Sequence, residues 1–322
     1  MKGLTILQVF KKTKRIFKLT KEVKTKVLKK TIMIVRKVIF NLLMLCFVNA
    51  FAQDMSTFEY PFRQENLIPW SIVAFDSQER SPAERVKMVK DLGFSQYAFG
   101  GREKHIKTME QELRLAKKEH IKISAVWLYL NPAKDAPGQL KTMSENIFKT
   151  LEKVGLQTEI WVGFAPNYFV NLTQEEALKK AVEMIAYLSN RAQKINCKIA
   201  LYNHGGWPGN PVNQLKIIKA LAQYEIGIIY NFHHAHLDLE AYNENLNLMR
   251  PYLWCVNLNG MRKDGPKILS IGKGDLEKEM IQSVLNTGYK GPFGILGHVK
   301  GGDPAIILKE NVEGLHTLFP ND

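Results

Sequence analysis

The sequence predicts an α/β fold, a (β/α)8 TIM barrel, over residues 53–322. Short apolar segments of strand composition alternate with helical patterns from Asn66 onward, and there are eight such segments. Several helical patterns stop at a glycine directly before the next apolar segment. The 270 residues that follow residue 52 also suit one large α/β domain, with no low-complexity linker to mark a second one.

The elements can be assigned in order along the chain. Two helices begin at clear signals: Ser81-Pro82-Ala83-Glu84 supplies an N-cap and a proline in the first turn, and Thr173 with Glu176 forms a capping box. Gly93, Gly155 and Gly288 are predicted to end helices. The predicted strands are 67–75, 94–99, 121–128, 158–163, 197–202, 226–232, 253–258 and 292–296.

The positive charge of the chain is concentrated at its beginning. The formal net charge is +14, but residues 1–52 hold 13 of the 45 lysines and arginines and only one of the 31 acidic residues. The remainder is therefore close to neutral. No basic face is needed to explain the domain, and we expect no nucleic-acid partner.

The beginning of the chain is typical of an export signal. Residues 33–52 combine Arg36 and Lys37, an apolar core over 38–48 and a small-x-small cleavage pattern at Ala50-Phe51-Ala52. Cleavage before Gln53 would give a periplasmic or secreted protein. The apolar core is short for a membrane span, so we expect no permanent anchor in the mature protein. Residues 1–32 are interpreted as an extension from an upstream start codon, or as a long n-region.

Asparagine and histidine gather where the later strands end. The fifth strand runs into Tyr202, His204 and Trp207, and the sixth into Asn231, His233, His234 and His236. Asn257 and Asn259 follow the seventh strand, and His298 follows the eighth. Because parallel barrels bind ligands at the carboxyl ends of their strands, these residues predict a site at the barrel mouth. Alternation along a regular strand would prevent His234 and His236 from sharing the inward direction of Asn231.

Other candidate residues have simpler structural interpretations. Trp127 and Tyr129 end the third strand and could face a sugar ring, but aromatic residues also close barrel mouths by packing alone. Asp76 and Glu65 are the best remaining carboxylates for a site, and Asp275 is predicted to be a helix N-cap. Lys263, Lys267 and Lys273 could meet an anionic substrate, or could simply be exposed. Cys197 and Cys255 are predicted to be buried thiols in strands rather than a disulfide.

The sequence resembles the xylose isomerase-like barrels, the sugar isomerase and epimerase superfamily. The resemblance is most specific from 197 to 298. It includes Asn257–Gly260, the glycine-rich segment Lys267–Asp275 and the segment Thr287–Ile295, which are similar to the family's seventh strand, G-x-G-D loop and eighth strand. The resemblance implies a sugar-like substrate and proton transfer next to a carbonyl. It also implies a divalent metal held by two Glu, an Asp and a His at the ends of strands five, eight, six and seven.

This sequence departs from that implied ligand set. Tyr202, Asn231 and Asn257 stand at three of the ligand positions, and Leu296, Gly297 and His298 lie near the fourth. His234 matches the family's substrate-facing histidine. Hard cations need anionic oxygen ligands, so the usual metal-assisted mechanism is in doubt. A different metal could be held by imidazoles, with the possible ligands His204, His234, His236 and His298.

Three functions fit these residues. The first is an exported isomerase or epimerase acting on a sugar or keto-sugar, with His204, His234 and His298 as catalytic residues. Tyr202, Asn231, His233, His236, Asn257, Asn259 and Trp207 would then bind substrate. The second is a keto-sugar lyase or hydratase that passes through the same enolate. The third is a sugar-binding protein without catalysis. The sequence leaves the cofactor and the oligomeric state open.

Overall fold

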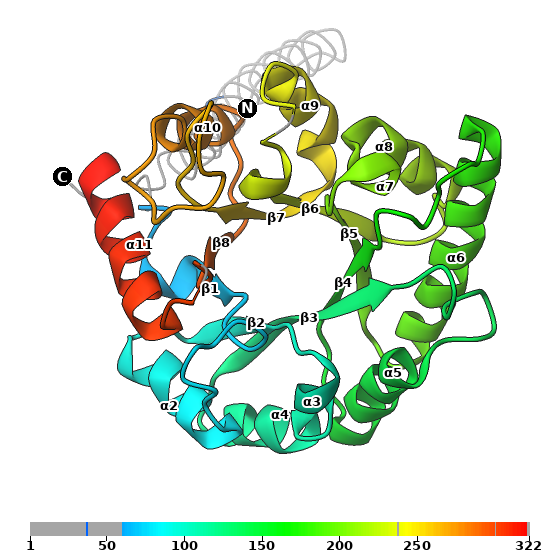
Figure 1. Cartoon of the computed structure of the whole chain (residues 1–322), viewed down its shortest axis with the longest axis horizontal. Helices are drawn as coiled ribbons and strands as arrows, with labels where there is room; N and C mark the ends of the chain where they lie inside the picture. The colour runs from blue at the N-terminus through cyan, green and yellow to red at the C-terminus, as the bar shows by residue number, and fades with distance from the viewer. Residues whose placement is uncertain (1–36, 38–59, 237, 300, 321–322) are drawn as a thin grey trace, which may run out of the picture. The chain divides into compact units, whose positions relative to one another are not determined.

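The structure is a computed structural model that describes residue 37 and residues 60–236, 238–299 and 301–320. The predicted export signal lies almost entirely outside these residues. Within Tyr60–Asp322, strands form a central ring with helices around it (Figure 1). None of the helices in the described part of the chain is both long enough and apolar enough to span a membrane.

Eight strands form a nearly closed parallel barrel, which confirms the predicted fold class. Their order around the sheet is β1-β8-β7-β6-β5-β4-β3-β2, and the neighbours in this order pair in parallel. The strands are β1 (Leu67–Trp70), β2 (Gln96–Phe99), β3 (Lys122–Leu130), β4 (Glu159–Phe164), β5 (Lys198–Tyr202), β6 (Ile226–Asn231), β7 (Leu253–Leu258) and β8 (Phe293–Leu296).

The helices surround the ring and start where their capping signals predicted. Ser81 and Thr173 each accept a hydrogen bond in a complete capping box, at the beginning of α2 and α6. Gly93, Gly155 and Gly288 adopt positive φ angles where a chain must turn back into the next strand. The helices are α2 (Pro82–Asp91), α3 (Glu103–Ile106), α4 (Met109–Lys118), α5 (Thr142–Val154), α6 (Gln174–Lys194), α7 (Gly206–Gly209), α8 (Pro211–Ala220), α9 (Tyr242–Met249), α10 (Glu277–Asn286) and α11 (Pro304–Leu318).

Two strands end earlier than predicted. β1 stops at Trp70 rather than at residue 75, because Ser71 takes a positive φ of 60° and turns the chain out of the ladder. β6 stops at Asn231, and a short 3-10 turn, η2 (Phe232–His234), follows at once. Both changes affect the site, since they set the directions of the residues at the barrel mouth.

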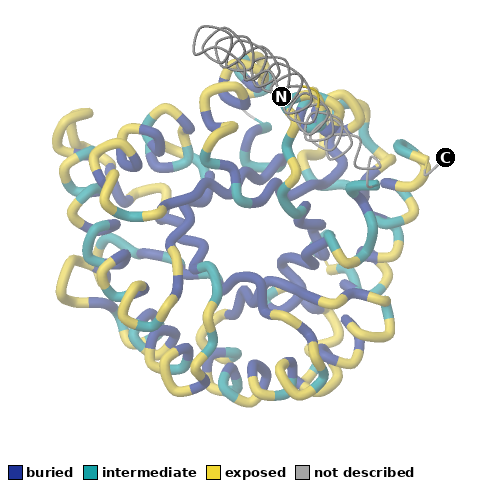
Figure 2. The backbone as a smooth tube through the Cα atoms, turned by 180° about the vertical axis from the view of Figure 1, so that it is seen from behind, coloured by how far each residue is buried: buried dark blue, intermediate teal, exposed yellow. Residues whose placement is uncertain are grey.

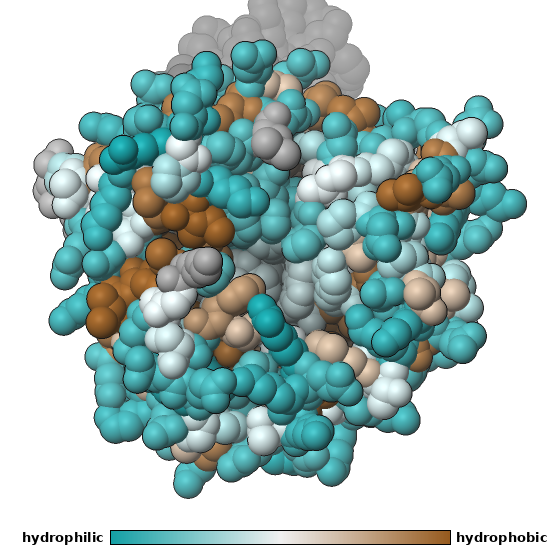
Figure 3. Space-filling view, viewed as in Figure 1, coloured by the Kyte–Doolittle hydropathy of each residue, from teal (hydrophilic) through white to brown (hydrophobic). Residues whose placement is uncertain are grey.

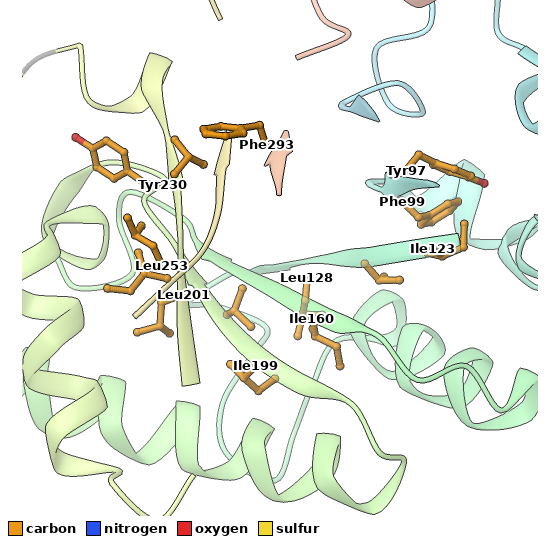
Figure 4. Packing of buried hydrophobic residues seen from close by; sticks show 14 of the residues in the cluster. Tyr97, Phe99, Ile123, Leu128, Ile160, Ile199, Leu201, Tyr230, Leu253 and Phe293 are labelled. Carbon is orange, nitrogen blue, oxygen red and sulfur yellow. The ribbon is translucent and has the colours of Figure 1, made fainter. Parts of the chain in front are cut away.

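The hydrophobic core has two layers separated by the strands. The outer layer packs strand residues such as Leu128, Ile160 and Leu201 against the helices (Figure 4). The ring of strands is accordingly buried on all sides, while the helices expose their outer faces (Figure 2). Cys197 and Cys255 are both buried and free, as predicted.

The inner layer fills the barrel with tryptophans set against glycines and alanines. Trp70, Trp161 and Tyr202 lie in this layer with three small residues, Ala98, Ala125 and Ala200. Trp127 packs against it and lies so close to Gly163 that a Cβ at residue 163 would come within 2.1 Å of the indole ring. The absence of a side chain at Gly163 therefore leaves the space that the Trp127 indole occupies.

Candidate active site at the barrel mouth

The candidate site is a cavity of about 460 Å³ at the carboxyl ends of the strands. Figure 3 shows a hollow near the centre of the ring. Aromatic and basic side chains dominate its lining. The lining residues are Trp70, Ser71, Ala74, Phe75, Gly100, Gly101, Arg102, Glu103, Trp127, Tyr129, Lys141, Met143, Tyr202, His204, His233, His234, Lys267, Ile268, Leu296 and His298.

Three imidazoles meet on one side of this cavity. The ring centroids of His204 and His234 are 4.6 Å apart, and those of His233 and His234 are 3.7 Å apart. His204 follows β5, whereas His233 and His234 follow β6, which pairs with β5. The structure therefore brings together the histidines that the strand-end pattern predicted would share a site.

The turn after β6 explains how two consecutive histidines reach one cavity. In a regular strand His233 and His234 would point to opposite faces. Instead Asn231 accepts a hydrogen bond on Oδ1 from the backbone N–H of His233, at 3.2 Å, and caps η2. Because η2 replaces the strand alternation, both rings line the cavity.

Burial keeps these imidazoles neutral near neutral pH. Burial is the largest cause of a lowered pKa in all three histidines. It lowers the pKa of His204, lowers that of His233 to about 3, and lowers that of His234 strongly. The positive charge of Lys267 lowers all three further. A neutral imidazole can accept a proton, so each is in the form that a general base requires.

Tyr202 forms the floor below the histidines. Its hydroxyl accepts a hydrogen bond from Trp70 Nε1, at 2.9 Å, and another from Asn231 Nδ2. Burial raises the pKa of Tyr202, so the phenol stays protonated. Asn257 is fully buried beside Gly294, where a Cβ at residue 294 would come within 1.7 Å of Asn257 Oδ1. Asn231 and Asn257 thus support the floor and do not line the cavity.

Aromatic rings form further parts of the cavity wall. Trp127 and Tyr129 stack on each other beside His204, which Tyr129 meets edge-on at a centroid distance of 5.2 Å. Phe75 stacks on His298 with ring centroids 3.8 Å apart, and the Arg102 guanidinium lies 5.0 Å from the Phe75 ring. Burial and the charge of Arg102 lower the pKa of His298. Flat faces of this kind suit the apolar faces of a sugar ring.

Besides Asn231 and Asn257, three more residues predicted to bind or ligate lie outside the cavity. Trp207 lies on α7, packs on Phe169 and donates from Nε1 to Gln174 Oε1 at 2.7 Å. His236 donates from Nε2 to the carbonyl of Arg262, at 2.7 Å. Asn259 donates from Nδ2 to the carbonyls of Gly260 and Lys267, at 2.8 and 2.9 Å. The last two support the loop after β7 rather than contacting a ligand.

The carboxylates singled out in the sequence are engaged elsewhere. Asp76 is buried in ion pairs with Arg80 at 2.7 Å and Arg85 at 3.4 Å. Glu65 forms an ion pair with Arg63 just before the N-terminal end of β1. The prediction that Asp275 is an N-cap is wrong, because α10 begins after Leu276 and Asp275 Oδ1 instead accepts from the backbone N–H of Lys263.

The predicted site residues leave out part of the cavity lining. Phe75 and Lys141 come from segments where no repeated residue pattern marks a site. The consecutive glycines of Gly100-Gly101-Arg102 do mark a loop after the second predicted strand, but packing is the simpler interpretation of that loop from sequence alone.

Comparison with solved structures identifies the type of barrel. The chain is similar to 3-keto-D-glucoside 4-epimerase YcjR from E. coli, with a TM-score of 0.59 at 16% identity, covering 79% of this chain and 98% of that one. It is also similar to IolI protein with a bound zinc atom, with a TM-score of 0.60 at 13% identity, covering 78% and 96%. The probable 3-DHS dehydratase AsbF from Bacillus anthracis matches with a TM-score of 0.55 at 16% identity, covering 75% and 95%.

The chain shares the (β/α)8 TIM barrel fold of these proteins. No protein-family model matches its sequence, and the search of curated proteins also found no match. The likeness therefore fixes the fold, and the chemistry has to be argued from the side chains.

The donor set in this barrel does not fit a divalent metal. Among the residues that the structure describes, no group of three His, Cys, Asp or Glu side chains, the adjacent His204, His233 and His234 included, is arranged so that it could hold a metal ion. His204 and His234 are adjacent, but His298 stacks on Phe75 and His236 bonds to a carbonyl. Tyr202 and Asn231 bond to each other. The predicted four-imidazole site is therefore not assembled.

Proposed function

We propose that this protein is a sugar isomerase or epimerase that transfers a proton next to the carbonyl of a keto-sugar or keto-glycoside. One observation carries the proposal: the neutral imidazoles of His204 and His234 meet in a cavity walled by Trp127 and Tyr129. The aromatic wall would hold the sugar ring, and the imidazoles would lie beside it. The epimerase YcjR and the probable dehydratase AsbF, which share the fold, support chemistry of this kind.

His204 is the proposed general base. Burial lowers the pKa of His234 strongly, so His204 is the better proton acceptor of the pair. It would take the proton from the carbon beside the carbonyl. The C–H electron pair then forms the enolate double bond, and the carbonyl π pair moves onto oxygen. His234 and the protonated Tyr202 hydroxyl would lie beside the bound sugar as neutral hydrogen-bonding groups.

The fate of the enolate decides the reaction class. Return of the proton to the opposite face of the same carbon gives an epimer. If the hydroxyl proton of that carbon first moves to the enolate oxygen, return of the proton to the former carbonyl carbon gives an isomer, with the new carbonyl where the hydroxyl was. A leaving group on the next carbon would instead depart with its bonding pair, which is the lyase alternative. The cavity suits each outcome, so keto-glycosides belong in the test together with keto-sugars.

The test is proton NMR of the purified protein with these substrates in D₂O. We expect deuterium to enter the carbon beside the carbonyl, and His204→Ala to slow this about 10²-fold or more, as loss of a general base does. His316→Ala, an exposed histidine on α11, is the matched control and should retain the wild-type rate. A chelator should have no effect, because the donor set does not fit a metal.

A sugar-binding protein without catalysis is the second candidate. The strongly lowered pKa of His234 favours this candidate, because a buried imidazole of such low basicity is better suited to hydrogen bonding than to accepting a proton. Such a protein would release heat on titration with a keto-sugar and yet incorporate no deuterium. That combination of results would contradict the enzyme proposal.

A further inference from the structure

Among the residues that the structure describes, three cationic side chains line the cavity, and their surroundings differ. Lys141 is engaged, since its Nζ donates to the carbonyl of Tyr129 and lies 3.5 Å from Asp135 Oδ2. Arg102 lies over the Phe75 ring. Lys267 makes no ion pair with any residue in the described part of the chain. Its charge is thus available to a bound molecule.

The backbone of Lys267 is fixed by a short hairpin over 260–269, called the Lys267 hairpin below. Gly260 and Leu269 exchange backbone hydrogen bonds of 2.8 and 2.9 Å. Arg262 N–H donates to the carbonyl of Pro266 at 3.0 Å. Gly260 is required here, because a Cβ at residue 260 would come within 2.3 Å of the carbonyl oxygen of Ser270.

Two of the residues that the sequence predicted as substrate contacts hold this hairpin in place. His236 Nε2 donates to the carbonyl of Arg262, and Asn259 Nδ2 donates to the carbonyl of Lys267 itself. These hydrogen bonds restrain the backbone of the hairpin at two points. They fix the origin of the Lys267 side chain at the cavity wall.

Lys267 shares a cavity with the three imidazoles. It lines the same cavity as His204, His233 and His234, and its charge acts on all three. Among the described residues of the lining, the only carboxylate is Glu103, which begins α3 next to Arg102. Lys267 therefore brings a positive charge without an ion-pair partner to the cavity that holds the proposed base.

We infer that Lys267 stabilises the negative charge that develops on the carbonyl oxygen of the substrate when His204 removes the proton. The inference rests on the proposed function. An enolate oxygen needs a fixed cation or strong hydrogen-bond donors, and Tyr202 and the imidazoles are neutral. The ammonium of Lys267 supplies that charge without any metal ligand set.

The experiment compares Lys267→Met with Lys263→Met, an exposed lysine of the same hairpin that does not line the cavity. The measurements are the rate of deuterium exchange at saturating keto-sugar and the affinity by calorimetry. For Lys267→Met we expect a rate about 10²- to 10³-fold lower, as when one oxyanion donor is removed, with affinity within about threefold. Lys267→Arg should retain part of the rate, and Lys263→Met all of it.

A second variant protects the test against a change in folding. Lys267→Cys treated with 2-bromoethylamine regains an ammonium at nearly the original length, and we expect it to recover most of the lost rate. Cys197 and Cys255 are buried, and the wild-type protein is treated in parallel. Failure of the treated variant to recover would count against the inference.

The possible failures can be told apart. If the wild-type protein exchanges deuterium but Lys267→Met does so equally fast, the inference is wrong and the proposed function stands. A loss in affinity alone, confined to sugars that carry a carboxylate, would assign Lys267 to substrate recognition and overturn the inference. A wild-type protein that takes up no deuterium overturns both.

Discussion

At the scale of single residues, His233 connects the site to acid stability. Burial and the charges of Lys267, His204 and His298 lower its pKa to about 3 in the folded protein, compared with 6.5 for an unperturbed histidine. Below pH 6.5 the unfolded chain therefore binds a proton that the folded chain refuses. The stability linked to His233 is complete above pH 6.5 and is lost as the pH falls toward 3.

We predict that His233→Asn makes the unfolding free energy less dependent on pH between about 6.5 and 3. One proton contributes at most about 1.4 kcal/mol per pH unit to this slope, so the variant's slope should be shallower by up to that amount. Urea unfolding of both proteins at several pH values measures it. Parallel curves for the two proteins would show that His233 titrates normally in the folded state.

The histidines also show what the sequence could predict of the site. His204, His234 and His298 line one cavity, because the carboxyl ends of parallel strands meet at one end of a barrel. The turn at η2, which brings His233 in as well, depends on a cap by Asn231 that strand alternation does not anticipate. Trp207 was predicted to bind substrate, but it lies outside the cavity and hydrogen-bonds to Gln174. Gln174 lies on α6, far from Trp207 in the sequence, so the sequence around Trp207 does not indicate this contact.

At the scale of elements, a buried ion network joins α2 to α4 and to the loop after β1. Arg85 Nε lies 2.9 Å from Glu112 Oε1, and Nη1 lies 3.4 Å from Asp76 Oδ2. Tyr97 donates to Glu112 as well, at 2.8 Å. Burial raises the pKa of Glu112, although Arg85 opposes it. Arg85 is thus the central cation of this network, and we expect its removal to destabilise the fold.

We predict that Arg85→Met lowers the unfolding free energy by about 3–5 kcal/mol, because it leaves the buried Glu112 carboxylate without its cation and Asp76 with Arg80 alone. Lys87→Met is the matched control on the same helix. Lys87 forms an exposed pair with Asp91, and such pairs contribute about 0–1 kcal/mol. Denaturant unfolding of the two variants measures the difference, and equal losses would contradict this account of the network.

The same scale shows why elements were predicted better than their ends. Capping boxes and terminal glycines are local signals, and they place α2 and α6 correctly. The apolar run after β1 continues through Ile72 and Val73, which are buried, so composition alone extends the strand. Only the positive φ at Ser71, set by tertiary packing, ends it at Trp70.

At the scale of the whole molecule, the location of the protein stays a prediction from residues 33–52. We predict that expression with this segment in a bacterial host yields an exported protein whose first residue is Gln53, as measured by mass spectrometry of the extracytoplasmic fraction. Ala52→Leu should block cleavage, because the processing site requires a small residue. Phe51→Leu should not, since the middle position is unrestricted. An intact chain found only in the cytoplasm would contradict the prediction.

The fit of Trp127 into the space above Gly163 has a consequence for how this cavity can evolve. A smaller side chain at residue 127 leaves Gly163 undisturbed, so a wider cavity is one substitution away. Any side chain at residue 163 collides with the indole, so change there must wait until residue 127 has been trimmed. Mutational paths at this wall therefore have an order, and a library that varies residue 163 alone would sample damaged barrels rather than new ligand preferences.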